Sequence, residues 1–108
     1  MEQELQVVAR LFPSVISGAK RSTIRWRETE IHPGLMRYTC VGNDNETTVV
    51  RVTRVTSMPL ADVASFLGIE ADWPPEIMLE GMREHYSEIH PADVVQVIEH
   101  LSPEESSE

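Results

Sequence analysis

The pattern of apolar and polar positions divides the chain into short strands and helices. The clearest strand is expected at Thr47–Ser57, where β-branched residues dominate and apolar side chains fall on both faces. Four more strands are expected from shorter apolar runs, at Glu4–Ala9, Lys20–Glu30, Leu35–Val41 and Val94–Ile98. Strands with apolar residues on both faces suit a curved sheet or a small barrel better than a sandwich.

Apolar residues at helical spacing predict three helices between these strands, at Arg10–Gly18, Leu60–Leu67 and Glu76–Ile89. Pro13 suits an early position of the first helix, and Gly18 suits its end. The sequence shows no internal repeat and no linker. We therefore expect one α+β domain over residues 1–101. The tail, residues 102–108, holds three acids and nothing apolar, and is predicted to be disordered.

Composition and charge limit the class of protein. The length of 108 residues, with 41% hydrophobic and 25% charged residues, is ordinary for one soluble domain. No apolar run approaches the roughly 20 residues of a membrane span, and no signal-peptide pattern opens the chain. The single cysteine, Cys40, excludes an internal disulfide and is expected to be a buried, inert thiol. These features favour a cytoplasmic protein that does not bind membranes.

The net charge of −9 argues against tight, sequence-blind binding of long nucleic acids, because phosphate neutralisation supplies most of that affinity. The tail contributes only three of the 18 acidic residues, so the chain is acidic without it. A small uncharged ligand, or a single nucleotide in a locally positive pocket, remains compatible with this charge.

The most basic stretch of this acidic chain is Gly18–Glu30. It contains four of the nine lysines and arginines, namely Lys20, Arg21, Arg25 and Arg27. In a strand, Ile24 and Trp26 would face a core, and Thr23 would lie on the other face with Arg25 and Arg27. One interpretation is a ligand pocket in which Lys20 activates the hydroxyl of Thr23. The other is a solvated, charged strand face, and the spacing leaves both open.

The loop before the third predicted helix carries further candidates. Glu76 fits the first turn of that helix, where a negative charge is favourable. Glu70 and Asp72 have no such structural explanation, and one of them is a candidate to reach the pocket. Trp73, beside two prolines, would either cover a planar ligand or close the loop over the core.

The four histidines are scattered and lack metal-ligand spacing, so neither a metal site nor a cofactor is expected. His85 falls on the apolar stripe of the third helix and is predicted to be packed there. His90 precedes Pro91 at the expected helix end.

Together these segments resemble the ASCH domain, a small β-barrel family of the PUA-like superfamily. The matching segments cover about Leu5 to Glu99 and include Ser17-Gly-Ala-Lys20, Ser22-Thr-Ile-Arg-Trp-Arg27, a Pro-Gly turn, Val52-Thr-Arg-Val-Thr56 and Val97-Ile-Glu99. The resemblance implies a barrel of about five to six strands with two to three flanking helices. It also implies a cleft beside the barrel for single-stranded RNA or a modified nucleoside.

One bacterial branch of the family hydrolyses the amide of N4-acetylcytidine, with a Lys and a Thr in a Lys-x-x-Thr-Ile-Arg stretch and a Glu from a later loop. The resemblance assigns the first two roles to Lys20 and Thr23, and the third to Glu70, or to Asp72. The loop departs from that branch, because Glu70-Ala-Asp-Trp73 stands where the branch has Glu-Gly-aromatic.

The expected function is therefore hydrolysis of an acylated nucleobase or nucleoside in a cationic cleft. Side chains expected to bind the ligand are Arg21, Arg25, Asp72 and Trp73. The alternatives are a non-catalytic RNA- or nucleotide-binding module and a single-strand RNA nuclease, which are activities implied by other family members.

Overall fold

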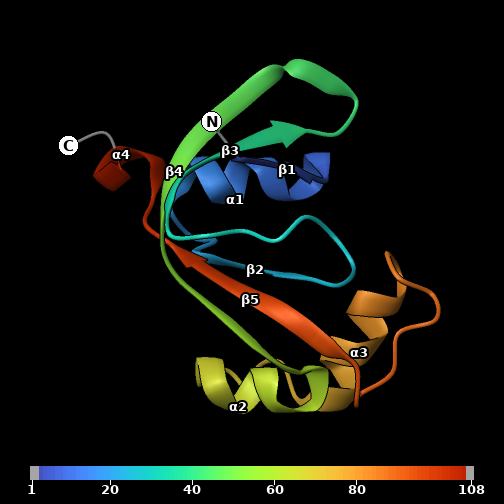
Figure 1. Ribbon diagram of the computed structural model, residues 1–108. Coiled ribbons are helices and arrows are strands. Elements are labelled where there is room, and N and C mark those ends of the chain that lie inside the picture. The colour runs from blue at the N-terminus through green and yellow to red at the C-terminus, as the bar shows by residue number, and fades with distance from the viewer. Residues whose placement is uncertain (1–2, 107–108) are drawn as a thin grey trace. The chain divides into compact units, whose positions relative to one another are not determined.

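The computed structural model describes residues 3–106, in which five strands form one sheet (Figure 1). Their order in the sheet is β1-β3-β4-β5-β2. β1 pairs with β3 in parallel, and β3 pairs with β4 antiparallel. The strands are β1 (Gln3–Val7), β2 (Ser22–Arg25), β3 (Gly34–Cys40), β4 (Asn43–Pro59) and β5 (Val94–His100).

Short helices connect or follow these strands, which confirms the expected α+β class. The α-helices are α1 (Phe12–Ser17), α2 (Val63–Leu67), α3 (Pro75–Arg83) and α4 (Pro103–Ser106). Single 3₁₀ turns, η1 (Ala9–Leu11) and η2 (Leu60–Asp62), precede α1 and α2. Among the residues described, no helix is both long enough and apolar enough to cross a membrane.

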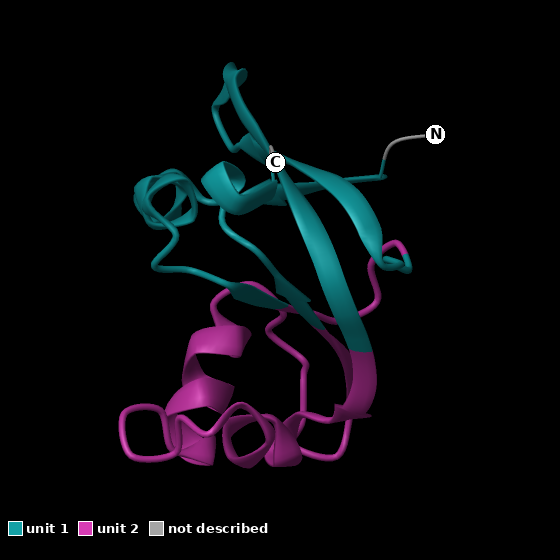
Figure 2. Cartoon of the chain, turned by 90° about the vertical axis from the view of Figure 1, so that its left-hand side faces the viewer, with its two compact units in different colours: residues 1–23, 30–55, 98–108 teal, residues 24–29, 56–97 magenta. Residues whose placement is uncertain are grey.

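The described residues fall into two compact units, coloured separately in Figure 2. The first unit contains residues 3–23, 30–55 and 98–106, and the second contains residues 24–29 and 56–97. The chain therefore passes between the units within β2, β4 and β5.

Each unit has its own buried apolar cluster. In the first unit the cluster joins α1 to β1, β3 and the first part of β4, and it includes Leu5, Val15, Met36, Tyr38, Val50 and Ile98. In the second unit it joins α2 and α3 to the first part of β5, and it includes Leu60, Val63, Met78, Ile89, Val95 and Val97. The neighbours Val97 and Ile98 are both fully buried because each belongs to a different cluster.

Glycines end the first two helices, as the sequence predicted for Gly18. Gly18 follows α1 with a φ of 86°, and Gly68 follows α2 with a φ of 72°. Both angles lie in the left-handed region, which glycine adopts without the strain that a Cβ atom causes.

The third predicted helix ends earlier than expected, at Arg83 instead of Ile89. The guanidinium of Arg83 donates to the carbonyl of Ile89 at 3.0 Å, and Ile89 is fully buried. The chain between them turns instead of continuing the helix. As a result His85 is exposed, and its predicted packing on a helical stripe is wrong.

The basic strand is also shorter than expected, because it covers only Ser22–Arg25 of the predicted Lys20–Glu30. Arg27 has a φ of 56°, a left-handed angle that cannot continue a strand. Thr23 is buried within this strand, with 5% of its surface exposed, whereas the two interpretations placed it on a face open to a ligand or to solvent.

The tail differs from the predicted disorder over residues 102–106. Ser102 and Glu105 cap the short helix α4 reciprocally: the Ser102 N–H donates to Glu105 Oε1 at 3.1 Å, and the Glu105 N–H donates to Ser102 Oγ at 3.2 Å. Ser106 is buried, and its hydroxyl donates to the Ser102 carbonyl and accepts from the N–H of Arg51 at 2.8 Å. Such a capping box satisfies backbone donors that disorder would leave to water.

Candidate functional site

Lys20 and Thr23 lie in the first unit, at the entrance of β2 and within it. The turn at Gly18 ends α1, and the Lys20 N–H donates back to the carbonyl of Ser14 at 2.9 Å. The ammonium of Lys20 donates to the carbonyl of Ser22 at 2.6 Å. The half-buried Lys20 side chain is thus held along the strand that carries the buried Thr23.

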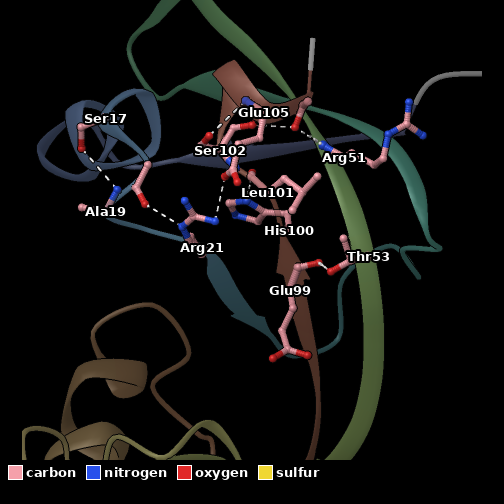
Figure 3. A network of polar contacts seen from close by, with 12 residues as sticks. Ser17, Ala19, Arg21, Arg51, Thr53, Glu99, His100, Leu101, Ser102 and Glu105 are labelled. Carbon is pink, nitrogen blue, oxygen red and sulfur yellow. Dashed lines mark hydrogen bonds and ion pairs between the residues drawn. The ribbon is translucent and has the colours of Figure 1, made fainter. Parts of the chain in front are cut away.

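Arg21, between these two residues, is the exposed cation of this group. Its Nε donates to the carbonyl of Gly18 at 3.1 Å. Its Nη1 lies 2.8 Å from Glu105 Oε1, and about half of each side chain is exposed. Figure 3 shows this ion pair between Glu105 of α4 and Arg21, the residue before β2.

His100, at the end of β5, is a chemical group beside this stretch that the sequence analysis did not single out. Its backbone N–H donates to the carbonyl of Arg21 at 2.9 Å, which joins the two segments. The imidazole is buried, and Nε2 lies 2.9 Å from the hydroxyl of the fully buried Tyr38. The buried positions of β5 include His100, but a strand pattern does not tell a packed histidine from a functional one.

The hydrogen bonds of His100 define its tautomer. Burial lowers the pKa of His100. The hydrogen bond to Leu101 opposes this effect in part, and smaller effects of the Lys20 and Arg21 charges lower the pKa further. Nδ1 lies 2.8 Å from the carbonyl of Leu101, which can only accept, so Nδ1 carries the proton. In the neutral ring Nε2 then accepts from the Tyr38 hydroxyl.

Arg25 lies in the second unit, where it forms part of a compact polar and aromatic cluster. Only 13% of its side chain is exposed, and its Nη1 lies 3.5 Å from Glu28 Oε1. The hydroxyl of Tyr86 donates to the other oxygen of Glu28, and the Tyr86 ring meets Trp26 edge-on at 5.9 Å. Trp26 is buried, which confirms its predicted place in a core. The guanidinium of Arg27 lies 4.2 Å from the Trp26 ring centre.

The loop between α2 and α3, also in the second unit, carries the remaining candidates. Glu70 and Asp72 are exposed in its turns, and Glu76 lies in the first turn of α3 as predicted. Trp73 is 47% exposed, and its ring lies against α3, where a Cβ atom at Gly81 would be 3.3 Å from it. This partial packing on a helix fits the predicted loop closure, and stacking of Trp73 on a ligand stays a prediction.

The structure thus places Lys20, Arg21 and Thr23 together in one unit. Arg25, Glu70, Asp72 and Trp73 belong to the other unit.

Within the described ranges, no group of three or more His, Cys, Asp or Glu side chains is arranged to hold a metal ion. Cys40 is buried, and burial together with the nearby Glu46 raises the pKa of its thiol, as the interpretation of an inert cysteine requires.

Comparison with known proteins identifies the fold. No protein-family model and no curated protein matches the chain. A solved structure of a mutant of ZmASCH from Zymomonas mobilis matches with a TM-score of 0.69 and 10% identity, over 94% of this chain and 68% of that chain. The hypothetical protein PH0355 matches with a TM-score of 0.69 and 20% identity, over 94% and 99% of the two chains. PF0455 from Pyrococcus furiosus matches with a TM-score of 0.60 and 21% identity, over 94% and 98%.

These likenesses extend over nearly the whole chain at low identity, so they concern the backbone arrangement and not the reaction. They confirm the architecture implied by the segments around Lys20–Arg25 and Val52–Thr56. The chain has the small, PUA-like α+β fold of an ASCH domain.

Proposed function

We propose that the protein hydrolyses the amide of an acylated nucleobase or nucleoside, with N4-acetylcytidine as the type of substrate. The observation that carries the proposal is the arrangement of Lys20 and Thr23. The Lys20 ammonium is hydrogen-bonded at 2.6 Å to the carbonyl of the residue before Thr23, in a stretch where Arg21 adds a second cation. A lysine held on the strand that carries a threonine, with a second cation next to it in the chain, is the kind of base that can activate a hydroxyl for attack on a carbonyl.

In the proposed reaction Lys20 first loses a proton to water, and its neutral amine then takes the hydroxyl proton of Thr23 as the hydroxyl oxygen attacks the acetyl carbonyl carbon. The C–N bond then breaks, and Lys20 returns the proton to the departing amine, which leaves as cytidine. Water hydrolyses the acetyl-threonine and releases acetate.

The charge of the chain supports a neutral substrate. A net charge of −9 repels polyanions at long range, whereas an uncharged nucleoside experiences no such penalty. We therefore expect turnover of N4-acetylcytidine to be nearly independent of salt, because no condensed counterions are released when an uncharged molecule binds.

The test is to incubate the purified protein with N4-acetylcytidine and to follow cytidine release. Thr23→Val removes the hydroxyl at nearly constant size, and Lys20→Ala removes the amine. Each variant is expected to lower kcat at least about a hundredfold. Thr23→Ser keeps a hydroxyl and should retain part of the activity, which separates loss of the nucleophile from loss of packing around this buried position. Unchanged turnover in Thr23→Val and Lys20→Ala would exclude the catalytic assignment.

A second candidate is a non-catalytic RNA- or nucleotide-binding module. It is favoured by the concentration of four of the nine basic residues in Lys20–Arg27, with Arg21 and Arg27 exposed. Absence of turnover, together with oligonucleotide binding that weakens steeply between low and moderate salt, would support this candidate. Cleavage of single-stranded RNA in the same assay would identify the nuclease variant of this function.

A further inference from the structure

The end of the described chain is fastened beside the basic stretch by contacts that do not depend on charge. Ser106 is buried, and it accepts the Arg51 N–H and donates to the Ser102 carbonyl at 2.7 Å. Ser102 is also buried, and it lies so close to Gly18 that a Cβ atom added at Gly18 would be only 3.0 Å from the Ser102 Cβ. These contacts hold α4 at the turn that leads into Lys20 and Arg21.

Glu105 is the acidic side chain that this attachment brings to Arg21. Its Oε1 accepts the Ser102 N–H at 3.1 Å and lies 2.8 Å from Arg21 Nη1. Hydrogen bonds with Ser102 lower the pKa of Glu105. Burial opposes them in part, and a smaller effect of Arg21 lowers the pKa further. The carboxylate is therefore charged at neutral pH, and it is oriented by its cap.

Arg21 has the properties of a residue that binds anions, and the Glu105 carboxylate already occupies its guanidinium. Its guanidinium keeps about half of its surface exposed, and it is anchored by one Nε–H bond to the Gly18 carbonyl. It stands one residue from Lys20 and two from Thr23. A guanidinium binds carboxylate and phosphate oxygens with the same fork of donors, so a phosphate could occupy the place of the Glu105 carboxylate.

We propose that Arg21 is an anion subsite beside the Lys20–Thr23 site, and that Glu105 fills it to favour uncharged nucleosides over phosphorylated nucleotides. The inference rests on the proposed function and deepens it, because it makes Glu105 a residue that determines substrate specificity. Specificity of this kind requires an element that disfavours the competing ligand. Glu105 provides it, since a phosphate group must displace a carboxylate that is already ordered and that repels it.

The variant Glu105→Gln tests the proposal with little change in structure. Glutamine is the other residue that serves at this position of a capping box, so the cap can persist while the charge is lost. Glu104→Gln is the matched control, because it removes the same charge one residue earlier. The probes are cytidine, cytidine monophosphate and inorganic phosphate, titrated at low salt and followed by NMR shifts of the backbone amides.

In Glu105→Gln, we expect cytidine monophosphate and inorganic phosphate to bind about two- to fivefold more tightly than in the native chain. The gain is modest because an exposed ion pair, such as Arg21–Glu105, contributes little free energy for a phosphate to overcome. Affinity for cytidine should not change. Glu104→Gln should have a smaller effect, and the double variant Arg21→Gln with Glu105→Gln should lose the gain.

Equal gains in Glu104→Gln and Glu105→Gln would overturn the proposal, because they would show a general charge effect. A gain that persists without Arg21, or no gain for either anion, would overturn it as well. If cytidine and N4-acetylcytidine fail to bind while phosphate responds as expected, the proposed function fails and the Arg21 subsite stands.

Discussion

His100 shows how a single residue couples the fold to pH. Burial is the main reason why its pKa is lowered in the folded protein, and its neutral ring connects Tyr38 to the carbonyl of Leu101. The unfolded chain regains the ordinary value of about 6.5. The unfolded state therefore binds a proton at a higher pH than the folded state does.

This difference predicts a loss of stability in mild acid. The free energy of unfolding should be nearly constant between about pH 8 and pH 7 and should fall as the pH decreases below about 6.5, because protonation of His100 then favours the unfolded chain. The loss is complete only below the folded pKa of His100. In His100→Gln the amide can donate to Leu101 and accept from Tyr38 at every pH. Thermal unfolding between pH 8 and pH 5 should therefore give a flatter profile for this variant.

The matched control is His85→Gln, which changes an exposed histidine. Its profile should keep the native slope between pH 7 and pH 5. The pKa of Glu105 is lowered from an ordinary value near 4.5, so its contribution disappears at more acidic pH and does not overlap this window. A slope that is the same in the native chain and in His100→Gln would contradict the assignment.

The sequence could indicate Lys20, Arg21 and Thr23 because their chemistry stands out in an acidic chain. It could not indicate His100, because its partners Tyr38 and Lys20 are 62 and 80 positions away in the chain. The burial of Thr23 could not be predicted either, because the alternation of apolar and polar residues in a four-residue strand is too short to show which face is buried.

Among the elements, α1 and α2 offer a direct comparison of two helix ends. Both end on a left-handed glycine, Gly18 or Gly68, but only Gly18 is closely approached by another segment. We expect Gly68→Ala to lower the free energy of unfolding by about 1–2 kcal/mol, the cost of a left-handed alanine. Gly18→Ala should lower it by about 1 kcal/mol more, because its Cβ would press on Ser102. Urea unfolding of the two variants measures the difference.

A third variant identifies the source of that difference. Ser102→Gly removes the Cβ that lies 3.0 Å from the added methyl, and it should bring the effects of Gly18→Ala and Gly68→Ala close together. Equal destabilisation by the two alanines in the native background would show that α4 is not held at Gly18.

The helices and strands also show which local signals a sequence carries. Ser102-Pro-Glu-Glu105 contains the spacing of a capping box with proline in the first helical position, so α4 was predictable from the tail despite its polar composition. The shortening of β2 could not be predicted, because arginine is not a residue type that indicates a left-handed φ such as that of Arg27. The early end of α3 depends on the bond from Arg83 to Ile89, which a helical pattern cannot reveal.

For the whole molecule, the sequence predicted the fold better than the site. Periodicity and turn residues defined most of the strands, and the resemblance around Lys20–Arg25 supplied their arrangement. The loop at Glu70–Trp73 has no periodicity, and the substitution of Ala-Asp for Gly removes the family signal at that point. The choice between Glu70 and Asp72 therefore depends on kinetics of the two single variants and not on pattern.

The division into two units raises the question of whether they unfold separately. Three strands are continuous between them, because β2, β4 and β5 each contribute residues to both. Loss of one unit would therefore break strands that the other unit needs. We expect the chain to unfold in one cooperative step, as small single domains usually do.

Two matched substitutions, each of which creates a cavity in one unit, test this cooperativity. Met36 lies in the cluster of the first unit and Met78 in that of the second, and each is at most 1% exposed. Met36→Ala and Met78→Ala should each lower the free energy of unfolding by about 2–5 kcal/mol. Both tryptophans belong to the second unit, so their fluorescence reports on that unit while far-ultraviolet circular dichroism reports on both. The two signals should change together in both variants. If Met36→Ala produced a transition in circular dichroism before any change in tryptophan fluorescence, the units would be independent, because the first would have unfolded around an intact second.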